Sequence, residues 1–198
     1  MAWIEELSAP RPEPARGGSA PDGRTLARIL STATTVPDHG GLRPWRFAVI
    51  TGDGQERFAD ALVAGLHAVR GAELPDAMVA KMRGKAHAAP CAVMVIASPR
   101  LESNVPEWEQ MASASCTGYA MVLAGTALGL GAAWKSAAVL DTAPVRALFA
   151  LAQHERLLGW INLGSPGEPA RGRGPGVDGP TLGGLVTVVG GDNRPFGR

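Results

Sequence analysis

The sequence predicts a single domain, residues 1–198, that combines α-helices with β-strands. A chain of 198 residues can bury one continuous core without disulfide or metal staples. Hydrophobic residues make up 45% of it and the mean hydropathy is +0.04, as in globular rather than disordered chains. Short apolar runs rich in β-formers alternate with longer segments of helical spacing, so we expect both element types along the chain.

The first 21 residues are expected to form an extended arm. Three prolines within residues 10–14 deny the backbone regular hydrogen bonds and favour an extended path. Asp22 is placed to cap a helix over residues 24–34, whose apolar side chains keep helical spacing. Pro37 then ends that helix.

Two buried strands are predicted in the first half of the chain. Residues 45–51 (WRFAVIT) and 91–98 (CAVMVIAS) are short apolar runs, and the first leads into a Gly-Asp-Gly turn. Helices are expected between them, over residues 55–69 and 75–88. Residues 109–128 then form a long proline-free segment rich in small side chains, which predicts a central helix that another backbone can approach closely. This favours a dimer interface along it.

The last third of the chain should add a helix and two strands. A helix is expected from Thr142 through residue 151, with Pro144 in its first turn. Residues 157–163 (LLGWINL) predict a strand, residues 165–180 a Gly/Pro-rich surface excursion, and residues 182–191 (LGGLVTVVGG) one more strand. That last strand could pair with a partner subunit's sheet or within its own chain, and both alternatives stay open.

One candidate site is the junction PDHGGLRPW, residues 37–45, where a helix end, a glycine loop and a strand start follow one another. His39 lies within it and is a surface-loop histidine, a structural histidine with its hydrogen bonds satisfied, or a ligand contact. The neighbouring glycines favour the last interpretation, because they let the backbone approach a ligand closely.

A second candidate is GLGAAWKS, residues 129–136, directly after the central helix. Gly129 suits a left-handed helix end. Lys135 and Ser136 place a cation beside a hydroxyl donor, a pair suited to phosphate. The alternative is a helix cap followed by a buried tryptophan and a solvated lysine. A dinucleotide-binding Rossmann loop is excluded, because these glycines follow a helix and do not complete GxGxxG.

Composition argues against several other classes of function. A net charge of +1 gives no broad attraction for nucleic acid or anionic membranes, so the expected partners are small molecules. The four histidines lack metal-ligand spacing, so no metal site is expected. Cys91 and Cys116 lie in apolar stretches and are expected to pack as small hydrophobes. No segment is apolar and long enough for a signal-peptide core or a membrane span, so a cytoplasmic location is expected.

Taken together, these motifs resemble the nitroreductase family, in particular its short bacterial single-domain branch. The resemblance covers residues 22–166: the helix before PDHGGLRPW, the strand WRFAVITGDG, the block VPEWEQMASASCTGYAMVLAGTALGLGAAWKS and the segment LLGWINLGSP. It implies an α+β three-layer sandwich, in which helices flank a central mixed or antiparallel sheet. It also implies an intertwined homodimer with two FMN sites at the interface, each lined by both chains.

The resemblance also implies roles for particular residues. His39 would lie near the ribityl and phosphate end of FMN, with Thr35 one helical turn earlier, and Trp134, Lys135 and Ser136 would meet the phosphate. The end of the central helix would accommodate the nicotinamide nucleotide. That segment comprises Ala124, Gly125, Thr126, Ala127, Leu128 and Gly129.

Three departures from the family pattern bear on flavin binding. An Arg-Arg-Ser motif that grips the FMN phosphate is usual, but this chain has Pro10-Arg11-Pro12, which leaves Arg11, with Arg16 as a substitute. Lys135 replaces a frequent arginine, and Arg43 stands where glutamine is common. Arg43 is either a cation that stabilises negative charge on the reduced ring or a surface ion-pair partner. Losing one charged phosphate contact costs about 1.5–3 kcal/mol, which would weaken FMN binding.

The activity implied is an FMN-dependent NAD(P)H oxidoreductase that passes electrons to a nitroaromatic, quinone or similar acceptor by a ping-pong mechanism. No side-chain catalytic residue is required, because the flavin performs the chemistry. One alternative is a family member with a degenerate site that binds or sequesters a flavin-like ligand. Another is an FMN-dependent dehydrogenase or oxidase of a biosynthetic pathway. The motifs do not choose between NADH and NADPH or name the acceptor.

Overall fold

The computed structural model describes residues 12–14, 17–169, 185–189 and 194–195, together with Ile4 and Leu7. The chain divides into two compact units, one of residues 11–169 and one of residues 1–10 with 170–198. In the second unit, β7 (Thr187–Val188) pairs antiparallel with β8 (Arg194–Pro195), so part of the predicted C-terminal strand pairs within its own chain. All other elements below belong to the first unit. Within the described residues, no helix has the length and apolar character needed to cross a membrane.

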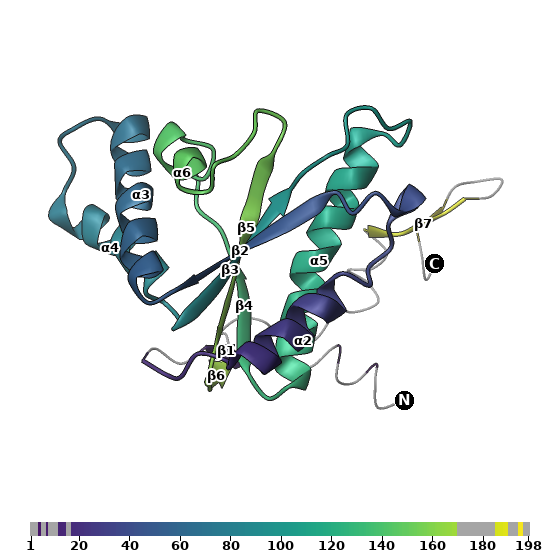
Figure 1. Cartoon of the computed structure of the whole chain (residues 1–198), viewed down its shortest axis with the longest axis horizontal. Coiled ribbons are helices and arrows are strands. Elements are labelled where there is room, and N and C mark those ends of the chain that lie inside the picture. Colours follow the sequence, from purple (N-terminus) through teal and green to yellow (C-terminus); the bar gives the residue numbers. More distant parts are fainter. Residues whose placement is uncertain are drawn as a thin grey trace. The chain divides into compact units, whose positions relative to one another are not determined.

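The centre of the larger unit is a four-stranded sheet with the order β2-β3-β5-β4 (Figure 1). Its strands are β2 (Trp45–Thr51), β3 (Cys91–Ala97), β5 (Arg156–Gly164) and β4 (Gly131–Lys135). All three neighbouring pairs are antiparallel. Of the two expected alternatives, a mixed or an antiparallel sheet, the structure therefore has the antiparallel one. The predicted bounds of β2 are confirmed, β3 ends one residue earlier than predicted, and β5 is one residue longer than predicted at each end.

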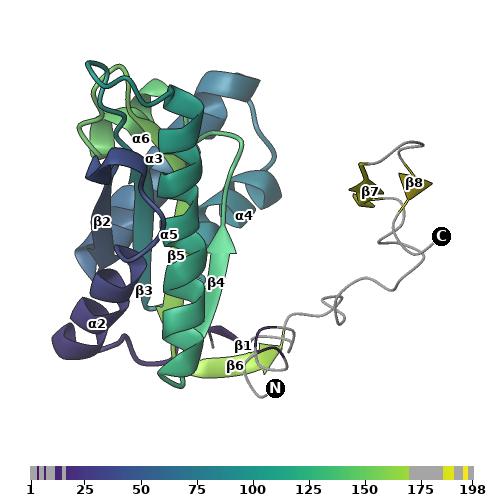
Figure 2. The ribbon, with the colours of Figure 1, turned by 90° about the vertical axis from the view of Figure 1, so that its right-hand side faces the viewer.

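Helices cover both faces of this sheet. One face carries α3 (Asp53–Arg70), α4 (Asp76–Ala86) and α6 (Ala143–Leu148), and the other carries α2 (Gly23–Ala33) and α5 (Glu107–Ala127) (Figures 1 and 2). Each face has its own apolar cluster, built around Phe58 and Trp160 on the first and around Ile29 and Met121 on the second. The predicted three-layer α+β arrangement is confirmed.

The helix predictions hold to within a few residues. Asp22 caps α2 as expected, because its Oδ1 accepts a hydrogen bond from the Thr25 amide at 2.7 Å. The prediction that ran from Thr142 to residue 151 was too long. Helix α6 ends at Leu148, and Ala150 then takes a left-handed φ of 46°, which an α-helix cannot include.

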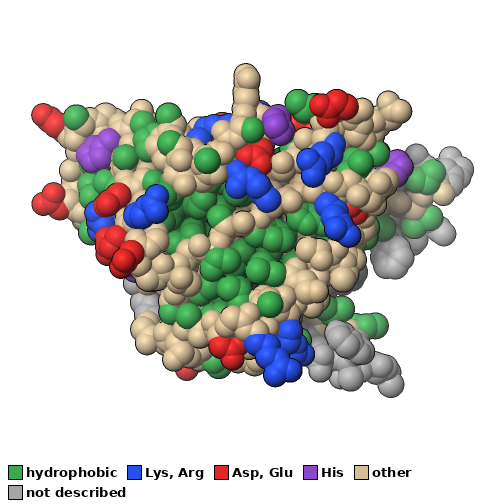
Figure 3. Space-filling model, in the orientation of Figure 1, with side chains coloured by type: hydrophobic (Ala, Val, Ile, Leu, Met, Phe, Trp, Pro, Cys, Tyr) green, Lys and Arg blue, Asp and Glu red, His purple; other side chains and the backbone are tan. Residues whose placement is uncertain are grey.

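Strand β2 is not the buried strand predicted from its composition. It is an edge strand that pairs with β3 alone among the described residues, and Ile50 is its one buried residue. Val49 is 46% exposed. Figure 3 shows hydrophobic side chains gathered in the middle of the face that it draws. Ala48, Ile50 and Phe149 help to line a hollow of about 170 Å³. By contrast, β3 has neighbours on both sides and is buried throughout.

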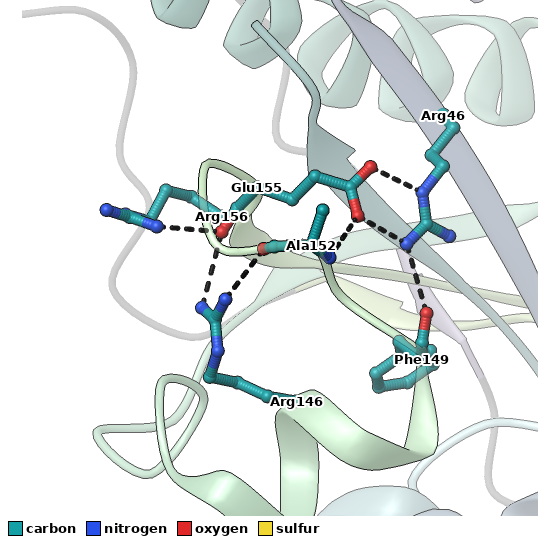
Figure 4. A network of polar contacts seen from close by, with 6 residues as sticks. All are labelled: Arg46, Arg146, Phe149, Ala152, Glu155 and Arg156. Carbon is teal, nitrogen blue, oxygen red and sulfur yellow. Dashed lines mark hydrogen bonds and ion pairs between the residues drawn. The ribbon is translucent and has the colours of Figure 1, made fainter.

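An ion pair fastens β2 to the turn before β5 (Figure 4). Two guanidinium nitrogens of Arg46 donate to the two carboxylate oxygens of Glu155, each at 2.7 Å, and one also donates to the Phe149 carbonyl at 3.0 Å. The Ala152 amide donates to the same carboxylate at 3.0 Å. Hydrogen bonds to Arg46 lower the pKa of the Glu155 carboxyl from its ordinary 4.5 to about 2. The carboxylate is thus held ionised although it is buried.

Two strands of the structure were not predicted from the sequence. β4 lies inside the second candidate motif, for which no strand was expected, and it forms because residues 131–135 pair with β5. Residues 165–180 were predicted as a surface excursion, yet β6 (Pro166–Pro169) pairs antiparallel with β1 (Pro12–Pro14). Within the predicted N-terminal arm, Pro12–Pro14 thus form a strand. Residues 170–180 lie outside the described residues.

Small residues of α5 pack on the chain's own sheet. A Cβ added to Gly118 would come within 2.7 Å of the Trp134 ring in β4. A Cβ at Gly125 would lie 3.1 Å from both Ala132 and Leu163. These two glycines therefore serve contact between α5 and the sheet of the same subunit.

Candidate functional site

A cavity of about 460 Å³ lies between α4 and the strands β4 and β5. It takes in Lys135 and Ser136, the polar pair of the second predicted motif. Its lining residues are Ala80, Lys81, Gly84, Lys85 and Ala88 from α4, with Lys135, Ser136, Trp160 and Asn162 from the β4–β5 side. Alternation along the strands explains the placement, since Lys135, Trp160 and Asn162 all point to the face covered by α4.

The lining of this cavity is cationic. Lys81 and Lys85 stand four residues apart on α4, and like charges at that spacing destabilise a helix slightly. Lys85 Nζ donates to the Ser136 carbonyl at 3.2 Å. No Asp or Glu is among the lining residues that the structure describes. A cavity with this charge favours an anionic ligand.

Lys135 is already paired from outside the cavity. Its Nζ lies 2.8 and 2.9 Å from the two carboxylate oxygens of Glu13 in β1. The sequence predicted that the arm near residue 11 would offer cations to a phosphate. In the part of the arm that the structure describes, the residue at the site is an acid. Arg11 and Arg16, the two predicted phosphate ligands, lie outside the described residues.

The floor of the cavity holds two buried polar side chains that the motifs did not single out. Trp160 is 1% exposed and Asn162 is 2% exposed. The Trp160 indole nitrogen has no hydrogen-bond partner in the described chain. The only signal for Asn162 in the sequence was a polar residue inside an otherwise apolar strand. Lys81 and Lys85 were noticed as basic positions but not assigned to a site.

The first predicted motif forms a different corner of the molecule. His39 begins a short 3-10 turn, His39–Gly41, in which Gly40 and Gly41 take left-handed φ angles of 75° and 64°. Its Nδ1 lies 2.8 Å from Glu109 Oε2 of α5. Because an ionised carboxylate only accepts, Nδ1 carries the proton in this contact. The predicted glycine loop is thus confirmed in its geometry.

Two further predicted residues lie near that turn. The Thr35 hydroxyl donates to the Thr32 carbonyl at 2.8 Å. Arg43 has a left-handed φ of 48°, and its backbone amide donates to Asp38 Oδ2 at 2.7 Å, so its exposed side chain projects from a fixed turn.

One chain does not bring the two motifs together. His39 contacts Glu109 in the first turn of α5, while Trp134 packs on Gly118 of the same helix. Gly118 follows Glu109 by nine residues, which is about 13.5 Å along a helix at 1.5 Å per residue. Trp134 Nε1 donates to the Leu158 carbonyl at 3.3 Å, so this side chain is engaged in packing.

The segment predicted for the nicotinamide nucleotide is partly buried. Ala124 and Gly125 belong to the packed side of α5, and the Thr126 hydroxyl donates to the Val122 carbonyl at 2.9 Å. Ala127 and Gly129 are exposed and Leu128 is half-buried. Gly129 has a φ of 77°, the left-handed helix end expected from the sequence. Only the last residues of this segment therefore offer surface to a ligand.

The cysteines differ from each other, contrary to prediction. Cys91 is buried, and burial raises the pKa of its thiol to about 11, so it packs as an inert small side chain as expected. Cys116 is exposed on α5, because helical spacing turns it away from the sheet. Among the described residues, no group of His, Cys, Asp or Glu could hold a metal ion.

A sheet covered by helices on both faces, with a cavity lined by three lysines beside β4 and β5, defines a three-layer α+β protein. The family model described as the nitroreductase family matches residues 19–165. The chain belongs to the nitroreductase family, which confirms the resemblance carried by the motifs.

Curated relatives and solved structures agree with that assignment. The chain is 37% identical over 147 residues to "Putative NAD(P)H nitroreductase YdjA" of Escherichia coli K12, covering 74% of this chain and 79% of that protein. A Haemophilus influenzae Rd protein, also named an NAD(P)H nitroreductase, is 32% identical over 153 residues, or 76% and 81% of the two chains. A nitroreductase-like protein of Bacillus cereus superposes with a TM-score of 0.74 at 18% identity, covering 95% and 96%. The FMN and NADPH-dependent nitroreductase NfnB of Sphigopyxis sp. strain HMH gives 0.64 at 21%, covering 84% and 89%.

Proposed function

We propose that this protein is an FMN-dependent oxidoreductase that takes electrons from NADH or NADPH and passes them to a small organic acceptor. The observation that carries the proposal is the cavity between α4 and β5, with Lys81, Lys85 and Lys135 in its lining and no acid among its lining residues. The curated relatives carry the name "Putative NAD(P)H nitroreductase", which supports NADH or NADPH as the electron donor, and the FMN and NADPH-dependent nitroreductase NfnB, whose fold this chain shares, supports FMN.

The residues present fit FMN. FMN is anionic, planar and edged with hydrogen-bonding groups, and the cavity offers cations at its rim and buried polar side chains at its floor. When bound, FMN supplies hydride acceptance and donation. The chain's own residues would hold it, orient it and exclude water, with Lys81 and Lys85 favouring negative charge on the ligand.

The nucleotide and the acceptor would use the same space in turn, as in a ping-pong scheme. The exposed end of α5, at Ala127 and Gly129, is the surface we assign to the nucleotide. A nitroaromatic or a quinone is the acceptor we propose. No side-chain general base is needed, and the cavity lining offers no carboxylate or histidine that could act as one.

We further propose that the enzyme is a homodimer that pairs through α5. Trp108, Ala112, Cys116 and Tyr119 recur at helical spacing on its outer face, and all four are exposed, Trp108 by 70%. An apolar stripe of this kind suits a second copy of the same helix. Sedimentation of Trp108→Glu should give monomers where the wild type gives dimers.

The test is a titration of the purified protein with FMN, followed by flavin fluorescence, and then anaerobic addition of NADPH. We expect saturable binding and bleaching of the flavin band. Lys81→Gln and Lys85→Gln should each weaken binding by about tenfold. Arg83→Gln is the matched control on the same helix, since Arg83 pairs with Glu56 and Asp60 outside the cavity. No binding by the wild type, or equal losses in all three variants, would refute the proposal.

A second candidate is a protein that binds the flavin without turnover. The Glu13–Lys135 pair favours it, because it neutralises a cation expected to meet the phosphate. Oxidation of NADPH by FMN-loaded protein in the presence of a quinone would exclude this candidate.

A further inference from the structure

The arm strand β1 lies directly on the end of the central sheet. A Cβ added to Gly131 of β4 would come within 2.5 Å of the Glu13 carbonyl oxygen and within 2.6 Å of Pro14 Cα. Gly131 has no left-handed φ, so its own backbone conformation does not require glycine. The close approach of the arm explains the missing side chain, because a residue with a Cβ would push β1 away from β4.

Backbone hydrogen bonds hold this arm only weakly. β1 and β6 are paired at Pro12 with Pro169 and at Pro14 with Pro166, and all four of these residues lack an N–H group. Prolines cannot donate the ladder hydrogen bonds that normally fasten a strand to its neighbour. Other contacts must therefore keep β1 in place.

One such contact joins the arm to a lysine of the cavity. The two carboxylate oxygens of Glu13 lie 2.8 and 2.9 Å from Lys135 Nζ, and Lys135 also lines the cavity. The side chains are 36% and 33% exposed, so water screens the pair and it can open. Carboxylate and phosphate oxygens are the same kind of acceptor for an ammonium group. Glu13 therefore competes with a phosphate for Lys135.

We propose that β1 is an autoinhibitory strap, in which Glu13 occupies Lys135 until a phosphate-bearing ligand displaces it. This inference rests on the proposed FMN-dependent function and adds a coupling between the ligand's phosphate and the arm. Once a phosphate takes Lys135, Glu13 faces an anion of like charge, which repels it. Because prolines fasten β1 weakly to β6, the arm then leaves β4. A flavin without a phosphate does not open the strap.

The first experiment measures the reactivity of Lys135 in the ligand-free protein. Acetic anhydride acetylates free amines, and an ammonium group held by a carboxylate reacts more slowly. Mass spectrometry after digestion should show Lys135 acetylated severalfold faster in Glu13→Gln than in the wild type. Glu168→Gln is the matched control and should leave the rate unchanged, because Glu168 is an exposed acid on β6 that pairs with none of the cations the structure describes.

The second experiment compares FMN with riboflavin, which has the same ring system but no phosphate. Glu13→Gln should bind FMN about fivefold more tightly than the wild type does, as expected for a partly exposed ion pair. Its affinity for riboflavin should not change. Gly131→Ala should also tighten FMN binding, because its Cβ would displace the arm while every charge is kept. Glu168→Gln should bind both flavins as the wild type does.

Several outcomes would overturn the inference. Equal acetylation of Lys135 in the wild type and Glu13→Gln would do so without any flavin. A gain in affinity that appears equally with riboflavin would contradict competition with phosphate, and a gain in Glu13→Gln without one in Gly131→Ala would contradict a strap. Failure of both the wild type and Glu13→Gln to bind FMN would refute the proposed function as well. That result differs from equal FMN binding by the two proteins, which would refute the strap alone.

Discussion

Replacing Glu155 with glutamine should expose how much the Arg46–Glu155 pair contributes to stability. The pKa of the Glu155 carboxyl falls from 4.5 to about 2 on folding. At 1.36 kcal/mol for each pKa unit, a difference of this size corresponds to about 3 kcal/mol. The Arg46 side chain is 39% exposed and partly screened by water, so we expect Glu155→Gln to lose about 2–3 kcal/mol at pH 7.

The pH dependence of that loss fixes its origin. A carboxyl whose pKa is lower in the folded state stabilises the fold fully above its unfolded pKa of 4.5. As the pH falls from 4.5 toward 2, the unfolded chain binds the proton first and the stabilisation disappears. Urea unfolding of wild type and Glu155→Gln at pH 7, 5, 4 and 3 should therefore give two curves that converge at low pH.

A matched control separates this pair from ordinary surface charges. Glu56 pairs with Arg83 but is 63% exposed, so Glu56→Gln should change stability by less than about 1 kcal/mol at pH 7. If Glu155→Gln costs no more than Glu56→Gln, or if its cost is the same at pH 7 and pH 3, the reasoning from the buried pair is refuted.

Three further predictions concern the site and its supports. Glu13→Gln should free Lys135 and tighten FMN binding, whereas Lys135→Gln should weaken it, as measured by fluorescence titration; a weaker Glu13→Gln complex would contradict the neutralising role of Glu13. Gly118→Ala should destabilise the fold by about 1–3 kcal/mol in thermal melts, because its Cβ would strike Trp134, whereas Gly84→Ala, which meets nothing within 4 Å, should stabilise it by about 0.5–1 kcal/mol. Glu109→Ala should lower the population of the Nδ1-protonated tautomer of His39 in nitrogen-15 spectra at pH 8.5, and an unchanged tautomer would show that Glu109 does not set it.

Local sequence signals predicted the parts of the fold that depend on near neighbours. The Asp22 cap, the span of β2 and the left-handed Gly129 each follow from a few adjacent residues. What sequence alone missed depends on pairing between distant segments. β4 became a strand through β5, and β6 through β1. The exposure of β2 follows from its place at the sheet edge, which composition does not report.

The candidate site was predicted unevenly for the same reason. Lys135 and Ser136 were predicted as site residues because they follow the glycines of the motif GLGAAWKS, residues 129–136. Lys81 and Asn162 belong to segments whose patterns indicate only a helix and a strand, and their common cavity exists because α4 packs over β5. The ion pair between Glu13 and Lys135 joins residues 122 positions apart, and no local sequence motif predicts such a contact.

Because the cavity is lined by segments that lie far apart in the chain, it can form only late in biosynthesis. The cavity needs α4 and β4 on its sides and β5 beneath, and β5 is the last of the three in the chain. A nascent chain halted before residue 156 would have the helices α2 to α6 but neither Trp160 nor Asn162. Ligand capture must then follow nearly complete synthesis of the larger unit, and a chain halted at that stage would leave its cationic wall without a floor.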